Sequence, residues 1–336
     1  MSSKSPQHGA IYVKTLAQSL LDQGYSDQQV FQGTGIDPTI LNIEKPFAGF
    51  DQIATFFEQA AVLTGDDALG LTHGQNREMR RAGLICYVGL SSPTVLVSIK
   101  NMTRYRRVFS DAIELDHQSL EADGILRWHY SVPASLKRRQ FVEFAASGLL
   151  RDLRRCANRR FTPDLVTFRH ARNSNIPAFG QHFGCEVIFG APDNSFRFQQ
   201  ADLALPLVTA DDELYAILRK CCEEALMEKS ANVPPVILDV ERKIAERLAA
   251  GEANQKSVAK ALGMSPRTLS RRLAHEGTTF FHVLEDLRRA LAVSYLRDSN
   301  LVLAEIAFLL GYAGQSSFND AFKRWTGQTP GQYRST

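Results

Sequence analysis

The sequence predicts an α+β domain that is followed by an all-helical domain. The chain has 336 residues, a length typical of two domains. Strand-like alternation occurs only before residue 231, and the adjacent prolines Pro234 and Pro235 block helix continuation soon after it. Beyond them the pattern is helical throughout, and a short helix, a tight turn and a second helix occur twice. We therefore place one domain at 1–232 and another at 233–336.

Helical spacing of apolar residues dominates the start of the chain. It predicts helices over 11–24, 27–31 and 51–65, the second of them capped by Asp27. A further helix is expected from Thr94 to Phe109, with Ser92 as its cap and Pro93 in its first turn.

Strands are predicted where apolar and polar residues alternate. The expected strands are 112–116, 125–132 and 165–168, with a turn at 121–124 between the first two. Residues 170–207 are rich in Gly, Pro and Asn and predict loops with short strands. Long helices are expected at 141–156 and 211–228. The first domain is therefore predicted to be α+β.

Residues 257–273 have the pattern of a helix-turn-helix unit. Gly263 suits the left-handed residue that follows a helix end, Ser265 is a good N-cap, and Pro266 suits the first helical position. The apolar positions are Val258, Ala259 and Leu262 in the first helix and Leu269 and Leu273 in the second. In DNA-binding proteins the second helix of such a unit, the recognition helix, enters the major groove.

The same pattern recurs at 304–325. The matching positions are Ile306, Ala307, Leu310 and Gly311 and, after one inserted residue, Phe318 and Phe322. A spacing that occurs twice gives stronger support than one copy. A helix over 280–296 is expected to join the two units, and a leading helix over 236–248 to complete the first unit's core.

Further residues of the second unit are distinctive. They are Ala304-Glu305-Ile306-Ala307, Gly311-Tyr312, Ser316-Ser317-Phe318, Ala321-Phe322-Lys323-Arg324-Trp325-Thr326-Gly327, Thr329-Pro330 and Tyr333-Arg334. Through them, residues 237–336 resemble the DNA-binding domain of the AraC/XylS family of bacterial transcription regulators. Through 183–192 and 205–207, the first domain more loosely resembles the ligand-binding half of the family's ornithine-utilisation-regulator group.

The charge distribution agrees with a DNA-binding second domain. The whole chain has a net charge of only +3. Residues 237–336 hold 14 Lys and Arg against 10 Asp and Glu, whereas residues 1–236 hold 25 and 26. The positive excess is therefore confined to the domain that carries the two units, as phosphate contact requires.

The resemblance places base-reading residues near the start and outer face of each recognition helix. They are Arg267, Ser270 and Arg271 in the first unit and Gln315, Ser316 and Asn319 in the second. Arginine suits guanine, and asparagine or glutamine suits adenine. Residues expected to contact phosphate or set position are Thr268, Arg272, Ser317, Lys323 and Arg324. The aromatic residues Phe318, Phe322 and Trp325 are expected in the core.

Asp320 departs from the basic residue that the family usually has at this position. A carboxylate near phosphates weakens binding unless it accepts a hydrogen bond from cytosine N4 or pairs with a neighbour such as Arg324. The second unit is therefore expected to read fewer bases than the first.

The first domain lacks the sequence signals of an enzyme or a metal site. It contains no nucleophile elbow, phosphate-binding loop, dinucleotide fingerprint or zinc-protease motif. The histidines and the five cysteines are dispersed without metal-ligand or disulfide spacing, so we expect neither metal nor cofactor. There is no apolar run long enough to span a membrane and no signal-peptide core, and we predict a cytoplasmic protein that reaches the nucleoid through DNA.

The resemblance implies that the first domain senses a small-molecule effector and forms a homodimer, and that the protein contacts promoter DNA and RNA polymerase. The alternatives are an effector-independent activator whose first domain only dimerises, and an enzyme-derived domain fused to a DNA-binding domain. Two residue sets bear on an effector site. The aromatic residues Tyr87, Trp128, Tyr130, Phe168 and Phe179 are either pocket lining or core, and core is favoured. The arginines Arg151, Arg154, Arg155, Arg159 and Arg160 either bind an acidic effector or form a solvated helix face, which is favoured.

Overall fold

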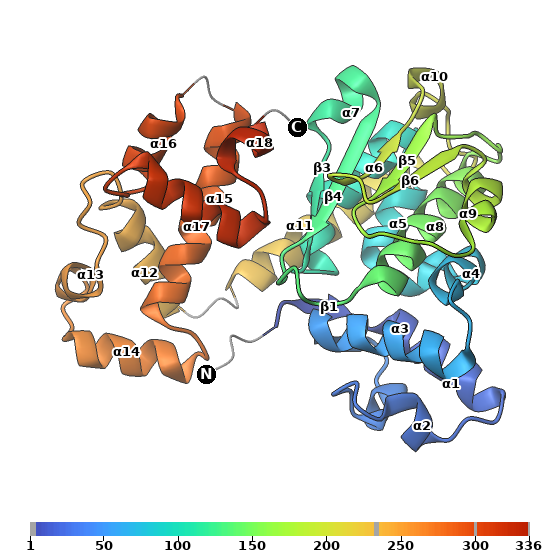
Figure 1. Cartoon of the computed structure of the whole chain (residues 1–336), viewed down its shortest axis with the longest axis horizontal. Helices are drawn as coiled ribbons and strands as arrows, with labels where there is room; N and C mark the ends of the chain where they lie inside the picture. The colour runs from blue at the N-terminus through green and yellow to red at the C-terminus, as the bar shows by residue number, and fades with distance from the viewer. Residues whose placement is uncertain (1–4, 232–234, 299–300, 335–336) are drawn as a thin grey trace. The chain divides into compact units, whose positions relative to one another are not determined.

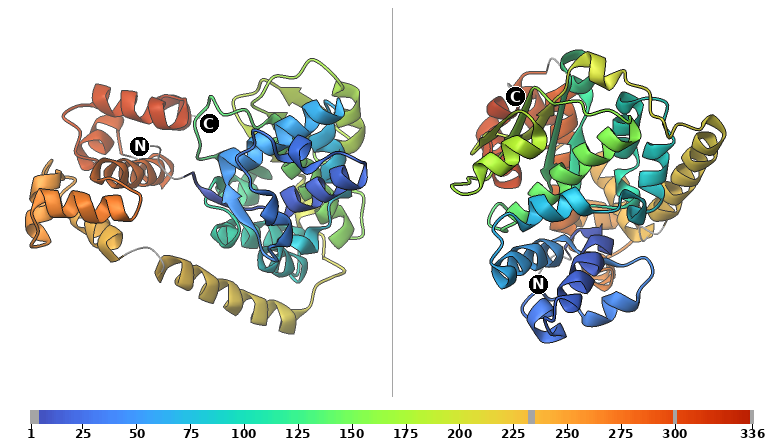
Figure 2. Two further views of the ribbon diagram at one scale, coloured as in Figure 1. Left: turned by 90° about the horizontal axis from the view of Figure 1, so that it is seen from below. Right: turned by 90° about the vertical axis from the view of Figure 1, so that its right-hand side faces the viewer.

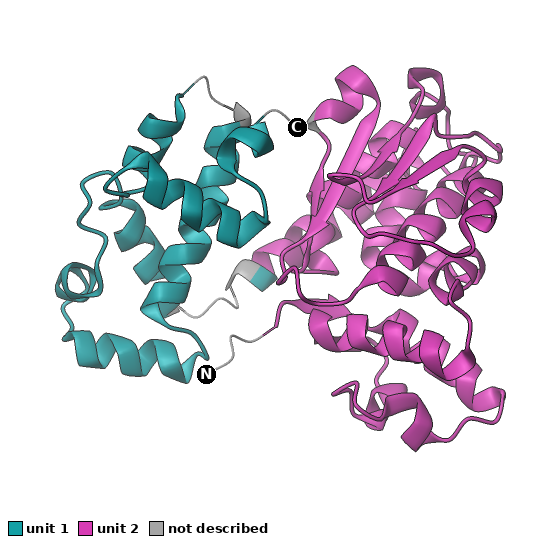
Figure 3. Cartoon of the chain, viewed as in Figure 1, with its two compact units in different colours: residues 1–4, 229–336 teal, residues 5–228 magenta. Residues whose placement is uncertain are grey.

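The computed structural model describes residues 5–231, 235–298 and 301–334. The chain forms two compact units, one of residues 5–228 and one that contains residues 229–336 (Figure 3). The boundary between them falls inside helix α11 (Asp212–Ala231). The linker expected at 231–235 lies largely outside the described residues.

The first part of the 5–228 unit is helical, with one short two-stranded sheet (Figure 1). Its helices are α1 (Ile11–Asp22), α2 (Asp27–Phe31), α3 (Phe50–Thr64), α4 (Leu69–Asn76) and α5 (Leu84–Leu90), with 3-10 turns at Pro38–Asn42, Met79–Ala82 and Arg106–Val108. Strand β1 (Gln7–Gly9) pairs antiparallel with β2 (Phe47–Gly49). Ser26 caps α2 in place of the expected Asp27, because its hydroxyl accepts the backbone N–H of Gln29.

Helix α6 (Val95–Arg104) is shorter than the sequence predicted. Thr94 is its N-cap and accepts a backbone N–H of the first turn. The expected cap, Ser92, instead donates its hydroxyl to the carbonyl oxygen of Val88 in α5. The cap prediction was wrong because Ser92 lies close enough to α5 to bond backward along the chain.

A five-stranded sheet follows, with strand order β3-β4-β7-β5-β6. The strands are β3 (Ile113–Asp116), β4 (Ile125–Tyr130), β5 (Leu165–Phe168), β6 (Glu186–Phe189) and β7 (Asn194–Arg197). The β5–β6 pair is parallel and the other neighbouring pairs are antiparallel. Between β3 and β4 the chain forms a short helix, α7 (Gln118–Asp123), where only a turn was expected, and Gly124 ends it with φ of +70°.

Helix α8 (Arg139–Cys156) packs directly on the backbone of α4. A Cβ atom on Gly70 would lie 2.1 Å from the carbonyl oxygen of Gln140, and one on Gly74 would lie 2.5 Å from that of Phe144. The two helices reach this separation only because neither glycine carries a side chain. Helices α9 (Ile176–Phe183), α10 (Gln200–Leu203) and α11 complete the unit, and Figure 2 shows α11 along its edge in both views.

The arginine run of α8 is not the uniformly solvated face that we expected. Arg154 donates to the carbonyl oxygens of Phe161, His182 and Phe183 over 2.7–2.9 Å and so binds the C-terminal end of α9. Arg151 donates to the carbonyl oxygen of Arg77. These two arginines connect parts of the unit, and the exposed members of the run are Arg155, Arg159 and Arg160.

The described residues of the 229–336 unit form helices and turns. The helices are α12 (Pro235–Ala245), α13 (Gln255–Ala261), α14 (Pro266–His275), α15 (Phe280–Asp298), α16 (Leu303–Leu309), α17 (Gln315–Thr326) and α18 (Pro330–Arg334). One apolar core joins α12–α14 to the first half of α15, and another joins α16–α18 to its second half. Leu291 of α15 contacts both cores. The predicted fold class, an α+β domain followed by helices in two joined units, is confirmed.

Candidate nucleic-acid interface

The turn of each repeated unit has the geometry that the sequence predicted. Gly263 after α13 and Gly311 after α16 have φ of +67° and +69°, in the left-handed region where glycine is favoured. Ser265 caps α14 by accepting the backbone N–H of Thr268 at 3.1 Å, and Pro266 is the first helical residue. Two helix-turn-helix units are therefore present, with α14 and α17 as their second helices.

Helix α14 presents two arginines on the side opposite its buried stripe. Leu269 and Leu273 are fully buried, and Arg267 and Arg271 lie about half a turn away from them. Both arginines are exposed, and neither forms an ion pair with any residue that the structure describes. Their guanidinium groups are therefore free to donate to a nucleic acid.

The other predicted residues of α14 lie at its flanks. Arg272 is exposed, whereas Thr268 is half-buried and its hydroxyl lies 2.9 Å from that of Ser265, within the helix cap. Ser270 is exposed, and its hydroxyl oxygen accepts a hydrogen bond from Nε2 of Gln255. Gln255 is the first residue of α13, and sequence reasoning missed it because its partner lies fifteen residues away on another helix.

Helix α17 has a different outward face. Phe318 and Phe322 are fully buried, as expected, and Asp320 is exposed on the opposite side. Asp320 occupies the position of Arg271, two residues beyond the first buried residue of its helix. The remaining exposed candidates are Gln315, Ser316, Ser317, Lys323 and Arg324. The second unit therefore presents a carboxylate where the first presents a guanidinium group.

Two further predicted residues of α17, Asn319 and Arg324, are not fully available to DNA as the structure stands. Asn319 is half-buried, and its Oδ1 atom is buried without a hydrogen-bond partner in the described part of the chain. A bidentate contact to adenine therefore requires this side chain to rotate. Arg324 donates to Oε2 of Glu285 at 2.6 Å, so its partner is the linker helix α15 and not Asp320.

Two polar residues of α15 orient the second unit, and sequence reasoning missed both. Glu285 accepts from Arg324 and also from the indole Nε1 of Trp325, at 2.8 Å. Arg288 donates to the carbonyl oxygens of Leu310 and Gly311 at 2.9 and 3.1 Å, at the end of α16. The available signal was a carboxylate and a guanidinium three residues apart beside the apolar face of one helix.

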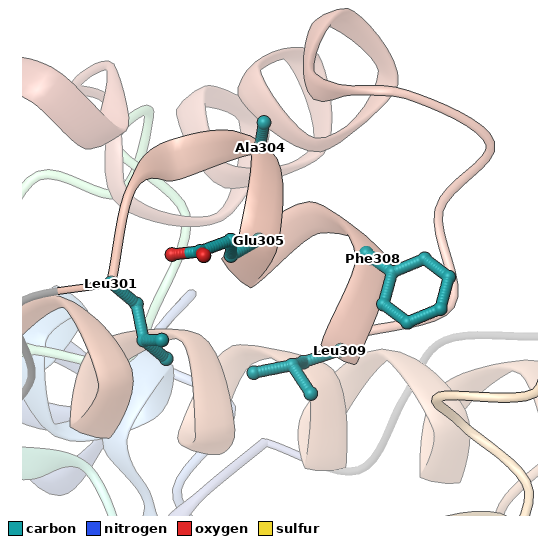
Figure 4. Close-up of a pocket in the computed structure, with 5 residues that line it drawn as sticks. All are labelled: Leu301, Ala304, Glu305, Phe308 and Leu309. Atoms are coloured by element: carbon teal, nitrogen blue, oxygen red, sulfur yellow. The ribbon is translucent and has the colours of Figure 1, made fainter.

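A shallow pocket on α16 is not part of this interface. Its lining residues are Leu301, Ala304, Glu305, Phe308 and Leu309 (Figure 4). The lining is mostly apolar, and the carboxylate of Glu305 already accepts the backbone N–H of Val302 at 2.8 Å. Such a surface offers no side-chain donor to a phosphate.

The 5–228 unit contains a serine–histidine contact that lacks catalytic geometry. Ser147 Oγ lies 3.0 Å from Nε2 of His182 but donates its proton to the carbonyl oxygen of Leu71 at 2.9 Å. Ser147 is fully buried, and burial lowers the pKa of His182 to about 4. Among the described residues, no carboxylate orients His182 and no three metal-ligating side chains converge. None of the helices within the described ranges is long and apolar enough to cross a membrane.

The aromatic residues considered for an effector pocket belong to the core. Trp128, Tyr130, Phe168 and Phe179 are each at most 5% exposed and pack against other rings. Tyr87, in contrast, is 41% exposed on α5. Their preferred interpretation as core residues is confirmed for the first four.

Comparison with known proteins covers both units. A family model described as the arabinose-binding domain of AraC transcription regulators matches residues 24–207, and a helix-turn-helix domain model matches residues 258–336. The ornithine utilization regulator of Pseudomonas aeruginosa is 30% identical over 330 residues, which cover 96% of this chain and 95% of that protein. The HTH-type transcriptional regulator VirS of Mycobacterium tuberculosis is 29% identical over 302 residues, which cover 89% and 88%.

One solved structure aligns over nearly the whole chain. The crystal structure of the transcriptional regulator CdpR from Pseudomonas aeruginosa covers 97% of this chain and 98% of its own, with 22% identity and a TM-score of 0.44. The first family model alone spans more than half of the chain, and the second spans both helix-turn-helix units. The two family models and the two relatives make the protein a DNA-binding transcription regulator. The chain belongs to the AraC family of transcription regulators.

Proposed function

We propose that the first helix-turn-helix unit is the main reader of an operator in double-stranded DNA. The observation that carries this proposal is the contrast between Arg271 and Asp320 at equivalent positions. Arg267 and Arg271 can each pair with O6 and N7 of guanine, whereas Asp320 can only accept, from cytosine N4 or adenine N6. The proposed readers are Arg267, Ser270 and Arg271, with Gln315, Ser316 and Asn319 contributing fewer base contacts.

The second helix-turn-helix unit is proposed to position the protein on DNA and to add affinity through phosphate contacts. Lys323 and Ser317 are exposed on α17 and suit phosphate contacts. Arg324 keeps 60% of its side chain exposed despite its bond to Glu285, so it can serve both partners. Since α15 joins the two units in one chain, a monomer can place α14 and α17 in successive major grooves, about 10 base pairs apart.

The 5–228 unit is proposed to bind a small-molecule effector and to form the homodimer. The effector proposal is supported by the match of residues 24–207 to a domain described as arabinose-binding in AraC. Dimerisation is supported by apolar side chains left in solvent on α11, where Leu214 and Ile217 are 42% and 60% exposed. Sedimentation of the full chain at micromolar concentration, with and without DNA, tests this assignment, and a monomer in both samples would contradict it.

Three further proposals follow from regulation at a promoter. The protein acts in the cytoplasm on nucleoid DNA, it contacts RNA polymerase, and its first domain catalyses no reaction. The buried position of Ser147 and the absence of an orienting acid for His182 among the described residues support the last point.

Sequencing the fragments that the purified protein enriches from a genomic library tests the central proposal. We expect one recurrent motif, and we expect Arg271→Ala to degrade one position of it. Enrichment without any shared motif would contradict sequence-specific binding. Repeating the selection with pooled metabolites tests effector response, because an effector that acts on DNA binding changes the yield of the same motif.

A further inference from the structure

The turn between α16 and α17 packs against the backbone of the first helix-turn-helix unit. A Cβ atom on Gly311, which lies in this turn, would be closer to the carbonyl oxygen of Leu248 than a carbon atom can approach an oxygen atom. Leu248 follows α12 and is buried in the core of the first helix-turn-helix unit. Gly263, the equivalent glycine of the first unit, has open space at the same position in the described part of the chain. The two helix-turn-helix units therefore meet directly at Gly311 as well as through α15.

A side chain of α15 also holds this turn. Arg288 donates from Nε to the carbonyl oxygen of Leu310 at 2.9 Å and from Nη2 to that of Gly311 at 3.1 Å. Its guanidinium group lies 4.4 Å from the ring centroid of Tyr312. Because the guanidinium group is planar and rigid, two bonds to consecutive carbonyl groups fix the direction of the turn as well as its distance from α15.

The position of this turn determines where the second recognition helix begins. Gly311 precedes Gln315, the first residue of α17, by four residues, so a displacement of the turn moves α17 relative to α14. In B-DNA each base pair adds about 3.4 Å of rise and about 35° of twist between two sites in the groove. Two recognition helices that are held at one separation and one angle can therefore engage two grooves fully at only one spacing of the base pairs that they read.

We propose that the contact of Gly311 with Leu248, held by Arg288, sets the operator spacing that the protein accepts. The inference rests on the proposed function, in which α14 and α17 enter successive major grooves of one duplex. Gly311 and Arg288 are positioning residues in this role, because they act through α17 and not through contacts of their own with DNA. Specificity then has two parts. Side chains of the recognition helices read bases, and this turn selects the number of base pairs between the two segments that are read.

The test begins with a selection of duplexes from a random library by the full-length protein, which should yield a motif with two segments. Arg271→Ala should degrade the segment that α14 reads and so assigns both. Three probes then carry one copy of the motif, with its natural spacing or with one base pair inserted or deleted between the segments. The wild type should bind both altered probes at least about tenfold more weakly, because one recognition helix then loses its base contacts.

Gly311→Ala should shift the preferred spacing. The added methyl group displaces the turn from Leu248 in one direction, so this variant should bind one altered probe roughly fivefold more tightly than the wild type does, and the natural probe more weakly. Gly263→Ala introduces the same left-handed strain but has no atom of the described residues within 4 Å of the added carbon. It should therefore keep the wild-type order of the three probes. Thermal unfolding checks that both variants are folded.

Arg288→Ala should broaden the preference in both directions. Without the two bonds to the turn, α17 can tilt either way, so both altered probes should bind this variant more tightly than they bind Arg289→Ala. That control removes the same charge from α15, but Arg289 pairs with Asp286 and not with the turn. Lys323→Ala controls for a second unit that merely binds DNA less well, and it should weaken the natural probe without any gain on the altered ones.

The outcomes separate this inference from the proposed function. If neither Gly311→Ala nor Arg288→Ala gains affinity for an altered probe, the turn does not set the spacing and the inference is overturned. If the wild type binds all three probes equally, or if the selection yields a single segment, one chain does not read two successive grooves and the proposed function has failed instead.

Discussion

The Oε2 atom of Glu285 lies 2.8 Å from the indole Nε1 of Trp325 and so joins the linker helix α15 to the second recognition helix α17. The same oxygen accepts from Arg324 at 2.6 Å. One turn further along α15, Arg288 binds the carbonyl oxygens at the end of α16 and lies over the ring of Tyr312 at 4.4 Å. Both helices of the second unit are therefore oriented by polar side chains of α15 as well as by its apolar core.

Removing Glu285 should destabilise the second unit. Glu285→Ala leaves the indole N–H of Trp325 without its acceptor, at a cost of about 1–3 kcal/mol in the free energy of unfolding. Glu285→Gln should cost less, because an amide oxygen still accepts from the indole. Urea unfolding followed by Trp325 fluorescence, in a Trp128→Phe background, measures both. The neighbouring variant Asp286→Ala, whose carboxylate is 70% exposed, should change stability by less than about 0.5 kcal/mol, and an equal loss in both alanine variants would contradict the assignment.

The two turn glycines should differ in their tolerance of alanine. Gly263 has open space around the position of a Cβ atom, so Gly263→Ala costs only left-handed strain, roughly 1–2 kcal/mol. At Gly311 a Cβ atom would lie 2.4 Å from the carbonyl oxygen of Leu248, at the end of the first unit's core. Gly311→Ala should therefore cost at least about 1 kcal/mol more than that strain and weaken specific DNA binding by displacing one unit from the other. Paired unfolding and binding titrations check it, and equal losses would show that the backbone contact yields easily.

The sequence alone predicted those features that depend on residues close together in the chain. Gly263, Ser265 and Pro266 each have the backbone role that their residue type predicts, and the recognition helices follow from them. What escaped prediction depends on partners far along the chain. The bond of Gln255 to Ser270 spans fifteen residues, and that of Glu285 to Arg324 spans thirty-nine. The periodic spacing of apolar residues in the sequence predicts neither bond.

The α+β unit shows the same division between local and distant contacts. The alternation at Trp128 and Tyr130 predicted β4, but nothing local revealed that Arg154 would bind the end of α9. An arginine on a helix face looks identical in sequence whether water or a carbonyl oxygen receives its hydrogen bonds. The sequence does not locate an effector site for the same reason. Four of the five aromatic residues considered for a pocket are buried in the core.

Acid should destabilise the 5–228 unit below pH 6.5. Burial lowers the pKa of His73 and of His182 from 6.5 to about 4, so both are neutral when folded and charged in the unfolded chain at pH 5. The unfolded state then binds more protons, and stability is lost as pH falls from 6.5 toward 4, by at most about 3 kcal/mol for His73. Glu58, whose pKa burial raises, opposes this trend.

The pH dependence of the urea midpoint between pH 7 and 5, followed by Trp128 fluorescence in a Trp325→Phe background, measures the effect. His73→Asn should remove about one proton from the slope. A slope unchanged by that variant would mean that His73 is protonated in the folded chain.

Neutralising Asp320 should strengthen non-specific DNA binding. Its exposed carboxylate lies on the outward face of α17, and in the proposed complex this negative charge would repel nearby phosphates. Asp320→Asn should therefore lower the dissociation constant for scrambled duplexes by a few-fold, with a smaller effect at 0.3 M salt than at 0.05 M. Glu305→Gln is a poor comparison because Glu305 caps α16, so Glu276→Gln, exposed near the end of α14, is the better control. Weaker binding by Asp320→Asn would instead indicate that the carboxylate accepts a hydrogen bond from a base.

Alanine substitutions at Arg271 and at Lys323 should weaken different kinds of DNA binding. Arg271 is exposed opposite Leu269 and Leu273 without an ion pair in the described residues, which suits a bidentate contact to guanine. Arg271→Ala should lose roughly 1–3 kcal/mol on the specific duplex and little on a scrambled one. Lys323 follows the buried Phe322 near the end of α17 and suits a phosphate contact.

Lys323→Ala should accordingly weaken both duplexes alike and lower the slope of log affinity against log salt by about one unit. Both variants are titrated against both duplexes over a series of salt concentrations. The wild-type protein gives the reference slope of log affinity against log salt for each duplex. The salt slope decides between the two roles, because a base contact contributes less counterion release than a phosphate contact does. If Arg271→Ala loses equally on both duplexes and also reduces the slope, then this arginine holds the DNA backbone and the reading face of α14 lies elsewhere on the helix.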